Sequence, residues 1–261
     1  MKRTLLLWFI LPALVLSCNK TPDPQPEPEI PAGAVRTGAV ASTYMGQTMN
    51  YTVWLPGNYD ESKTYPFLYL LHGYGDDHLS WNSKGGANKM ADKYLKAGGV
   101  PMIIIMPDAK QTFYIDNFNF NGLYFEQYMH NELMPEVESK YRCNGKRAVA
   151  GLSMGGFGTL YNVLKYPSKF TYGYAMSPAT DADSSVALIK AQSSPSVFPP
   201  ITIESGTTDW TIPIQGVRDY VQVLKENGVE VKFIERSGGH DWGFWPVCLQ
   251  KALVAVGETF K

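Results

Sequence analysis

The stretch Gly151-Leu152-Ser153-Met154-Gly155 carries the G-x-S-x-G pattern. It directly follows residues 147–150, which are typical of a strand, and it precedes residues 156–165, which are typical of a helix. In that context the pattern predicts a sharp strand-to-helix turn that strains the serine backbone and exposes its hydroxyl group. The two glycines fit because the strand and the helix crowd together at such a turn. We therefore expect Ser153 to be a nucleophile, and a glycine-rich turn without chemistry is the alternative.

The segments on either side of this turn alternate between strand-like and helix-like patterns. Short, continuous apolar runs such as 67–71 and 102–106 suit strands that are buried on both faces of a parallel sheet. The predicted strands are 36–44, 47–55, 67–71, 102–106, 147–150, 201–204 and 229–234, and the predicted helices are 87–97, 125–140, 156–165, 214–227 and 243–259. This alternation predicts an α/β fold with a mainly parallel central sheet and helices on both of its faces.

The composition limits the class of protein further. A chain of 261 residues with 44% hydrophobic and 18% charged residues fits one large α/β domain. The 23 Lys and Arg residues against 24 Asp and Glu give no basic excess, so no nucleic-acid partner is expected. Three cysteines exclude a disulfide scaffold and a four-cysteine zinc site, and the sequence has no H-E-x-x-H motif. We expect neither a metal nor a cofactor.

The first 34 residues have the pattern of an export and tethering segment. Lys2 and Arg3 precede an apolar run, 5–16, that is shorter than the roughly 20 residues of a membrane span. The ending Ser17-Cys18 resembles the lipobox of bacterial lipoproteins, in which the cysteine becomes the lipidated first residue. We expect a signal peptide over 1–17, with an ordinary signal or an uncleaved anchor as the alternatives.

Proline stands at every second position of 22–28, which favours an extended, stiff chain. We expect residues 18–34 to be a tether, rather than a ligand for a proline-binding module, and residues 35–261 to be the globular domain. The protein is then exported and lipid-anchored to a bacterial membrane, with the outer membrane as the expected one, on its periplasmic or cell-surface face.

A serine nucleophile needs a base, which is normally a histidine held by a carboxylate. In α/β-hydrolases the chain order is serine, acid, histidine. The four histidines are His72, His78, His130 and His240, and only the last follows the serine. His240 is therefore the predicted base. His72 is expected to be a structural turn residue, and His78 and His130 are expected to lie at the surface.

The acid is expected between the serine and the base. The candidates are Asp181, Asp183, Glu204, Asp209, Asp219, Glu226, Glu230 and Glu235. Asp209 follows the predicted strand 201–204, and open α/β sheets place their sites at the carboxyl ends of strands. Asp181 and Asp183 precede a helix and fit helix caps. Asp209 is therefore the predicted acid.

Acyl transfer also needs N–H groups that point at the developing oxyanion. The backbone N–H of Met154, directly after the nucleophile, is the first predicted donor. The second is expected in the loop His72-Gly73-Tyr74-Gly75, which follows the strand 67–71. We choose the N–H of Tyr74, with Gly73 permitting a close turn.

Four motifs together carry a family resemblance. They are Leu70-Leu71-His72-Gly73-Tyr74-Gly75, Ala150-Gly151-Leu152-Ser153-Met154-Gly155-Gly156, Ser205-Gly206-Thr207-Thr208-Asp209-Trp210 and Gly238-Gly239-His240-Asp241-Trp242. From about Val35 to the C-terminus the chain resembles the esterase D-type esterases, which include the feruloyl and acetylxylan esterases of carbohydrate esterase family 1. The resemblance implies an α/β-hydrolase fold and hydrolysis through an acyl-enzyme. It also implies Ser153 as nucleophile, Asp209 as acid and His240 as base.

The segment 112–124 departs from the family pattern, because relatives carry a shorter tyrosine-containing loop there. Its aromatic residues are Phe113, Tyr114, Phe118, Phe120 and Tyr124. Since it follows the strand 102–106, these rings are expected at the site, where they could pack on a cinnamoyl group or a sugar. A local core for a long loop is the alternative. Trp210 is also predicted to contact substrate, and the sequence leaves open whether Cys143 and Cys248 form a disulfide.

The sequence thus predicts a serine carboxylesterase that removes feruloyl or acetyl groups from plant cell-wall polysaccharide or its oligosaccharides. Two alternatives stay open: a hydrolase of siderophore esters or short peptides, and a noncatalytic glycan-binding lipoprotein. The sequence makes no prediction of the oligomeric state.

Overall fold

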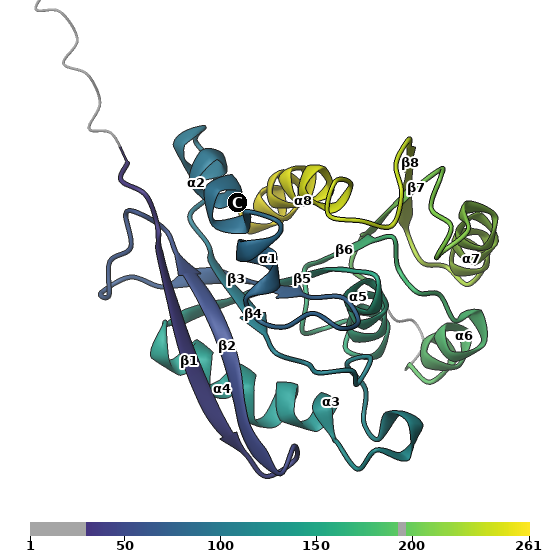
Figure 1. Cartoon of the computed structure of the whole chain (residues 1–261), viewed down its shortest axis with the longest axis horizontal. Coiled ribbons are helices and arrows are strands. Elements are labelled where there is room, and N and C mark those ends of the chain that lie inside the picture. Colours follow the sequence, from purple (N-terminus) through teal and green to yellow (C-terminus); the bar gives the residue numbers. More distant parts are fainter. Residues whose placement is uncertain (1–29, 193–196) are drawn as a thin grey trace, which may run out of the picture.

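The parallel strands around the G-x-S-x-G turn are part of one eight-stranded sheet in the order β1-β2-β4-β3-β5-β6-β7-β8 (Figure 1). The computed structural model describes residues 30–192 and 197–261. The strands are β1 (Ala34–Ser42), β2 (Gln47–Leu55), β3 (Tyr65–Leu71), β4 (Ile103–Pro107), β5 (Cys143–Leu152), β6 (Tyr172–Met176), β7 (Ile201–Gly206) and β8 (Val231–Arg236). β1, β2 and β4 pair antiparallel, and all the other pairs are parallel.

Helices cover both faces of this sheet. They are α1 (Ser80–Ser83), α2 (Ala87–Lys96), α3 (Phe125–Tyr128), α4 (Met134–Lys140), α5 (Met154–Lys165), α6 (Ala182–Lys190), α7 (Ile214–Glu226) and α8 (Trp245–Phe260), with a 3₁₀ turn at Phe118–Phe120 and a π-helical turn at Met129–Leu133. Residues of α1, α2 and α8 share one buried cluster, and residues of α3 to α7 belong to or pack on the other. The prediction of an α/β fold with a mainly parallel, doubly covered sheet is confirmed.

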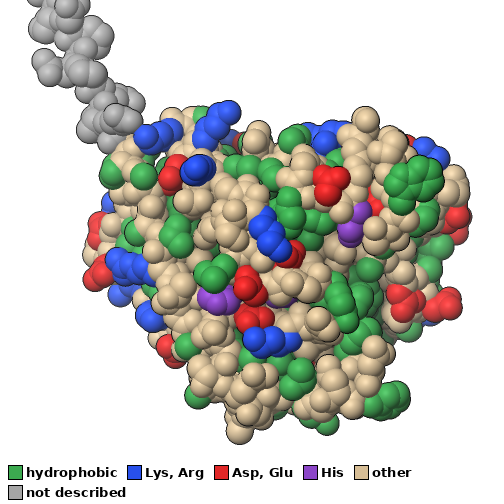
Figure 2. Space-filling model, in the orientation of Figure 1, with side chains coloured by type: hydrophobic (Ala, Val, Ile, Leu, Met, Phe, Trp, Pro, Cys, Tyr) green, Lys and Arg blue, Asp and Glu red, His purple; other side chains and the backbone are tan. Residues whose placement is uncertain are grey.

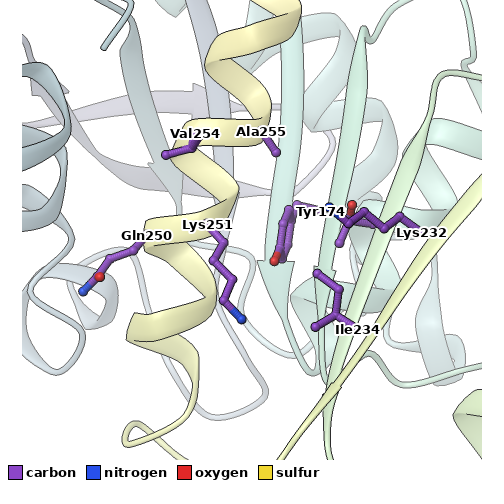
Figure 3. A pocket seen from close by; sticks show the side chains of 8 residues that line it. Tyr174, Lys232, Ile234, Gln250, Lys251, Val254 and Ala255 are labelled. Carbon is purple, nitrogen blue, oxygen red and sulfur yellow. The ribbon is translucent and has the colours of Figure 1, made fainter. Parts of the chain in front are cut away.

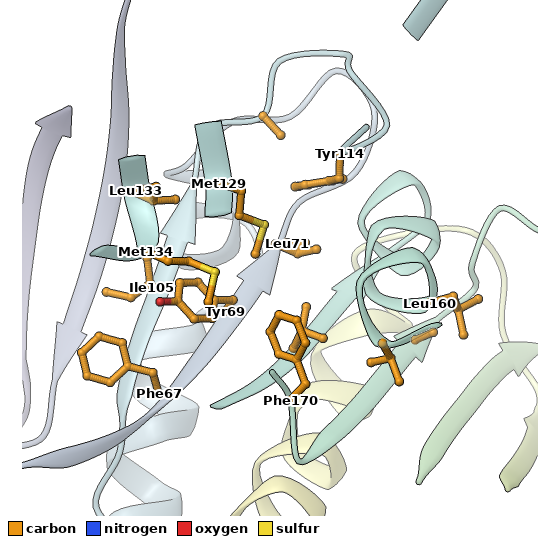
Figure 4. Packing of buried hydrophobic residues seen from close by; sticks show 14 of the residues in the cluster. Phe67, Tyr69, Leu71, Ile105, Tyr114, Met129, Leu133, Met134, Leu160 and Phe170 are labelled. Carbon is orange, nitrogen blue, oxygen red and sulfur yellow. The ribbon is translucent and has the colours of Figure 1, made fainter. Parts of the chain in front are cut away.

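The pleat of the central strands divides the core between the two faces. In β3, Phe67, Tyr69 and Leu71 point into the cluster beneath α4 and α5, which Figure 4 shows in part. Leu68 and Leu70 point into the cluster beneath α2 and α8. All five side chains are fully buried. This is the physical reason that a strand at the centre of the sheet reads as a continuous apolar run.

Some elements differ from the sequence prediction. The strand β6, Tyr172–Met176, was not predicted: it has no β-branched residue and contains Gly173, although it pairs with β5 and β7. The predicted helix 125–140 is confirmed as helical, but a π-helical turn interrupts it at Met129–Leu133. Cys143 and Cys248, whose pairing the sequence leaves open, are free thiols.

The predicted signal peptide, Cys18 and most of the tether lie outside the described residues. Within the described residues, no helix combines the length and apolar character that crossing a membrane would require. The boundaries at residues 17 and 34 therefore stay predictions.

His130 corrects a prediction, because it is not a free surface residue. Its Nε2 lies 2.9 Å from Oδ1 of Asn162, and Nζ of Lys169 lies 3.2 Å from its Nδ1. Its ring packs on Tyr166 at a centroid distance of 4.1 Å. Burial, with the nearby Lys169 charge, lowers the pKa of His130 from 6.5 to about 4. No local sequence pattern indicates these contacts, because the partners of His130 lie 32 or more residues away in the chain.

The low pKa of His130 predicts an acid-sensitive fold. Between pH 6.5 and about 4 the unfolded chain binds a proton at His130 that the folded chain does not, so stability falls as the pH falls. From pH 7 to pH 5 this contributes a loss of about 2 kcal/mol. In urea unfolding, His130→Gln is expected to lose less free energy over that interval than the wild type by about this amount. Equal losses in the two proteins would contradict the assignment.

Candidate active site

The turn between β5 and α5 holds Ser153 in a strained backbone conformation, with φ 53° and ψ −114°. Its N–H donates to the carbonyl of Met176 at 2.9 Å, and its own carbonyl accepts the N–H of Ala179 at 3.1 Å. A positive φ is costly for any residue with a Cβ, so the surrounding contacts must impose it. The predicted sharp turn is therefore present, and Ser153 lies at the carboxyl end of a central strand.

Two glycines make the turn possible. A Cβ on Gly155 would lie 2.5 Å from the carbonyl oxygen of Leu71, and a Cβ on Gly151 would lie 2.3 Å from the carbonyl oxygen of Gly155. Both distances are far inside van der Waals contact, and the opposing atoms are backbone, which cannot rotate away. The close approach of β3, β5 and α5 thus requires glycine at both positions, as the sequence predicted.

The structure brings Ser153, His240 and Asp209 into one hydrogen-bonded chain. Nε2 of His240 lies 2.9 Å from Oγ of Ser153, and its Nδ1 lies 2.8 Å from Oδ2 of Asp209. The second carboxylate oxygen of Asp209 accepts the N–H groups of Thr211 at 2.9 Å and Ile212 at 2.8 Å. Asp209 is buried, so these bonds fix the orientation of its carboxylate. The three side chains come from loops after β5, β7 and β8.

The loop that carries His240 is tied to the loop that carries Asp209. The N–H and the hydroxyl of Thr208 both donate to the carbonyl of Gly238, at 3.1 and 2.9 Å. The imidazole of His240 also packs edge-on against the ring of Trp245, at a centroid distance of 5.1 Å. Acid and base are therefore positioned together, and the histidine ring has a fixed plane.

The predicted oxyanion donors lie on two sides of the serine. Met154 is the first residue of α5, so its N–H has no acceptor one turn earlier in the helix. The loop after β3 passes beside the serine, since a Cβ on Gly73 would lie 3.6 Å from Cβ of Ser153. Tyr74 follows directly, with an exposed side chain. Their roles as donors stay predictions.

His72 is buried, and both of its ring nitrogens have a protein partner. Nδ1 lies 2.8 Å from the carbonyl oxygen of Gly73, which makes it the protonated nitrogen, and Nε2 accepts the N–H of Ala109 at 2.9 Å. Burial lowers the pKa of His72, so the ring is neutral. It is a structural residue of the turn, as expected.

The predicted substrate-binding aromatics differ widely in exposure. Tyr114 is a correction: it is fully buried, its hydroxyl donates to the carbonyl of His72, and it cannot touch substrate in this structure. Phe120 is 93% exposed, Tyr124 is 40% exposed and Trp210, next to the acid, is 91% exposed. The alternative interpretation of segment 112–124, a local core for a long loop, is therefore correct for Tyr114.

Phe113 and Phe118 belong to the aromatic loop, residues 112–124. Phe113 contacts the oxyanion loop, residues 72–75, which is named for its predicted donor. The rings of Phe113 and Phe118 stack at a centroid distance of 4.5 Å, and Phe113 lies 6.1 Å from the ring of Tyr74. Phe157 of α5 joins them, with its ring edge-on to Phe113 at 5.8 Å. Phe157 was not singled out in the sequence analysis. Its position four residues after Ser153, in the first turns of α5, could have suggested it as a candidate.

The other candidate acids have different roles. Glu204 is fully buried and binds Arg236 at 2.9 Å, Lys251 at 2.7 Å and the hydroxyl of Tyr174 at 2.5 Å. Burial raises its pKa, but these hydrogen bonds lower it more, so the net pKa is below the usual value. Asp181 caps α6 by accepting the N–H of Ser184, as the sequence predicted.

Neither of two cavities in the described part of the chain is lined by Ser153, Asp209 or His240. A cavity of about 460 Å³ lies between α8 and strands β6 to β8, and no residue of the hydrogen-bonded chain lines it (Figure 3). A hollow of about 380 Å³ lies between the oxyanion and aromatic loops, lined by Gly75, Asp76, Lys110, Gln111, Asn121 and Leu123. Charges of both signs are interspersed on the face shown in Figure 2. Across residues 30–192 and 197–261, no group of three His, Cys, Asp or Glu residues could hold a metal.

The close approach at Gly155 predicts a large effect of one methyl group. Gly155→Ala must push back the backbone of Leu71 and His72, which is expected to cost about 2 to 3 kcal/mol of stability and to displace the oxyanion loop. Gly216→Ala is the matched control, because Gly216 is an exposed helical residue with nothing within 4 Å of its Cβ position. That variant should be neutral or up to about 1 kcal/mol more stable. Equal stability of the two variants would contradict the crowded turn.

Residues 42–256 match the Esterase family, described as "Putative esterase". An acetyl esterase of Caldicellulosiruptor saccharolyticus is 27% identical over 223 residues, which cover 71% of this chain and 80% of that protein. An endo-1,4-beta-xylanase/feruloyl esterase of Xylanibacter ruminicola is 27% identical over 239 residues, which cover 85% of this chain but only 31% of that longer protein.

Solved structures show the same fold. A ferulic acid esterase superposes with a TM-score of 0.77 at 27% identity, over 88% of this chain and 99% of the other. An S-formylglutathione hydrolase of Staphylococcus aureus superposes with a TM-score of 0.72 at 22% identity, over 86% and 96%, and shows the fold alone. With the family match over most of its length, the chain belongs to the Esterase family and is a serine carboxylesterase of the α/β-hydrolase type.

Proposed function

We propose that the protein hydrolyses feruloyl or acetyl esters on plant cell-wall polysaccharide or its oligosaccharides, through an acyl-enzyme formed on Ser153. The observation that carries the mechanism is the continuous chain of hydrogen bonds from Asp209 through His240 to Ser153. The similarity to an acetyl esterase and to a xylanase/feruloyl esterase supports the substrate class.

In the first half of the reaction, Oγ of Ser153 attacks the ester carbonyl while Nε2 of His240 takes its proton. The imidazolium that forms is stabilised by the Asp209 carboxylate, which the amides of Thr211 and Ile212 hold in place. The N–H groups of Met154 and Tyr74 bind the oxyanion of the tetrahedral intermediate. His240 then gives its proton to the sugar oxygen, and the alcohol leaves.

In the second half, water attacks the acyl-serine. His240 now accepts the proton of the water and returns it to Oγ as the bond to the acyl carbon breaks. The carboxylic acid is released and the serine is restored. The cycle needs no group beyond these side chains, the two backbone amides and water.

The stack of Phe113 on Phe118 supports an aromatic acyl group. The ring of Phe113 lies 6.1 Å from the ring of Tyr74, the residue whose N–H is the proposed second oxyanion donor, and the ring of Phe118 stacks on Phe113. A planar hydroxycinnamoyl group can stack on such rings, whereas an acetyl group is too small to reach them. We therefore place the acyl group of a feruloyl ester on the Phe113 side of Ser153.

The cellular placement is also a proposal. A lipid on Cys18 and a stiff tether over residues 18–34 would hold the domain away from a bacterial membrane, near bulky substrates. Metabolic labelling with a radioactive fatty acid tests this: the label is expected in the wild type and lost in Cys18→Ala. Full labelling of the variant would contradict the anchor.

The mechanism predicts distinct effects of two substitutions. Ser153→Ala should abolish hydrolysis and labelling by a fluorophosphonate, because the nucleophile is gone. Asp209→Asn should lower kcat by roughly 10³- to 10⁴-fold, since an amide neither fixes the needed histidine tautomer nor stabilises the imidazolium. Asp219→Asn, at an exposed position of α7, is the matched control and should retain full activity. Activity of Ser153→Ala near that of the wild type would refute the mechanism.

The stacked rings predict which substrates one substitution affects. Phe118→Ala is expected to lower kcat/KM for methyl ferulate by about 5-fold, because a stacking partner worth about 1 kcal/mol is lost. Its kcat/KM for 4-nitrophenyl acetate should change less than 2-fold by the same reasoning. Steady-state kinetics on both esters and on acetylated xylan provide the comparison. A parallel loss on both small esters would remove the support for a feruloyl group.

A further inference from the structure

We propose that Tyr114 is a positioning residue for the oxyanion hole, holding the peptide between His72 and Gly73 so that the next N–H, that of Tyr74, faces the reacting carbonyl. The inference rests on the proposed function, which gives that N–H its role. It assigns a task to a buried tyrosine that touches neither the substrate nor the triad.

The first support is a single long-range hydrogen bond. The hydroxyl of Tyr114 donates to the carbonyl oxygen of His72 at 2.9 Å, across 42 residues of sequence. The bond is fully buried, so it has no water to replace it. Burial raises the pKa of Tyr114 well above its usual value, so the hydroxyl stays a donor.

The ring of Tyr114 has little freedom to move. A Cβ on Gly158 would lie 2.6 Å from this ring, so the ring rests directly on the backbone of α5. On another side Phe125 packs edge-on at a centroid distance of 5.1 Å. The helix that begins at Met154, the first proposed donor, therefore also supports the ring that fixes the segment carrying the second donor. Both proposed donors are thus positioned by α5.

The imidazole of His72 supplies a second connection to the same segment. Nδ1–H of His72 donates to the carbonyl of Gly73, and Ala109 donates its N–H to Nε2. Ala109 and Tyr114 belong to the loop that follows β4, so this loop holds both the main chain and the side chain of His72. The peptide before Tyr74 cannot rotate without breaking one of these bonds.

The loop itself is built to make these contacts. Phe113 and Tyr114 both have positive φ, 52° and 62°, which non-glycine residues rarely adopt. The hydroxyl of Thr112 donates to the carbonyl of Ala109 at 2.8 Å and accepts the N–H of Tyr114 at 3.2 Å. The ring of Phe113 lies beside Tyr74, while the ring of Tyr114 lies in the core. The aromatic loop thus contacts the oxyanion loop from two sides.

Tyr128 offers a matched control for the hydroxyl of Tyr114. It is also fully buried and packs on the same Phe125, at a centroid distance of 5.5 Å. Its hydroxyl, unlike that of Tyr114, has no hydrogen-bond partner within the described part of the chain. Tyr114→Phe and Tyr128→Phe therefore remove the same atom from the same cluster, and only the first breaks a bond to the oxyanion loop.

The test compares these two variants with the wild type, using methyl ferulate kinetics, inhibition by an aryl trifluoromethyl ketone and thermal unfolding. In Tyr114→Phe, kcat should fall about 10- to 100-fold with KM within about 2-fold, because a displaced donor weakens binding of the transition state only. Affinity for the ketone, whose adduct carries an oxyanion, should weaken by a similar factor. Tyr128→Phe should match the wild type in both readouts.

A Tyr114→Phe variant that folds and keeps kcat and ketone affinity within about 2-fold of Tyr128→Phe would overturn the inference. If Tyr114→Phe does not fold, Thr112→Val decides the question. It removes the hydroxyl that bonds the N–H of Tyr114 and should lower kcat by about 3- to 10-fold at unchanged KM. An unchanged kcat in that variant would overturn the inference as well.

Failure of the proposed function gives a different result. If Ser153→Ala keeps its activity, the acyl-enzyme mechanism is wrong, whatever the tyrosine variants do. If Ser153→Ala is inactive while the two tyrosine variants behave alike, the mechanism stands and only the positioning role of Tyr114 fails.

Discussion

The close approach of β3, β5 and α5 at the Ser153 turn is the constraint on which the rest of the site depends. A Cβ on Gly155 would lie 2.5 Å from the carbonyl oxygen of Leu71, and a Cβ on Gly151 would lie 2.3 Å from that of Gly155. The three elements can therefore pack this closely only with glycine at both positions. The same crowding holds Ser153 at a φ of 53°. The strain is compensated by ordinary packing of a sheet that is buried on both faces. The exposed hydroxyl is therefore a product of the fold and not of a flexible loop.

Three further loops meet at this turn, and each is fixed by bonds between loops. The acid loop and the base loop are joined through Thr208 and Gly238, and the carboxylate of Asp209 is held by two amides. The oxyanion loop is held by His72 and Tyr114. Preorganised groups of this kind stabilise a transition state without a cost in reorganisation energy when charge develops. The aromatic loop thus has two parts: buried Tyr114, which bonds the carbonyl of His72, and the rings of Phe113 and Phe118, which we propose contact the acyl group.

Local patterns were sufficient to predict the fold class and the residues that the structure brings together at Ser153. The turn pattern, the strand ends and the chain order of serine, acid and histidine can all be recognised in the sequence, and they predicted Ser153, Asp209 and His240. The burial of Tyr114, the partners of His130 and the contact of Phe157 with Phe113 depend on residues 30 or more positions apart. Composition showed that segment 112–124 is aromatic, but it could not show which rings face inward. The strand β6 was missed because Tyr172–Met176 has no β-branched residue and contains Gly173. Its pairing with β5 and β7 places it in the sheet.

In the mechanism that we propose, the ester passes through a covalent intermediate on Ser153. The most direct measurement mixes the enzyme with 4-nitrophenyl ferulate, quenches it in acid during the first turnover and maps the acyl group by peptide mass spectrometry. We expect a burst of nitrophenol close to one equivalent of enzyme, with the feruloyl group on the peptide that contains Ser153 and on the serine itself. Turnover without any acyl-protein, or an acyl group on another residue, would contradict this mechanism.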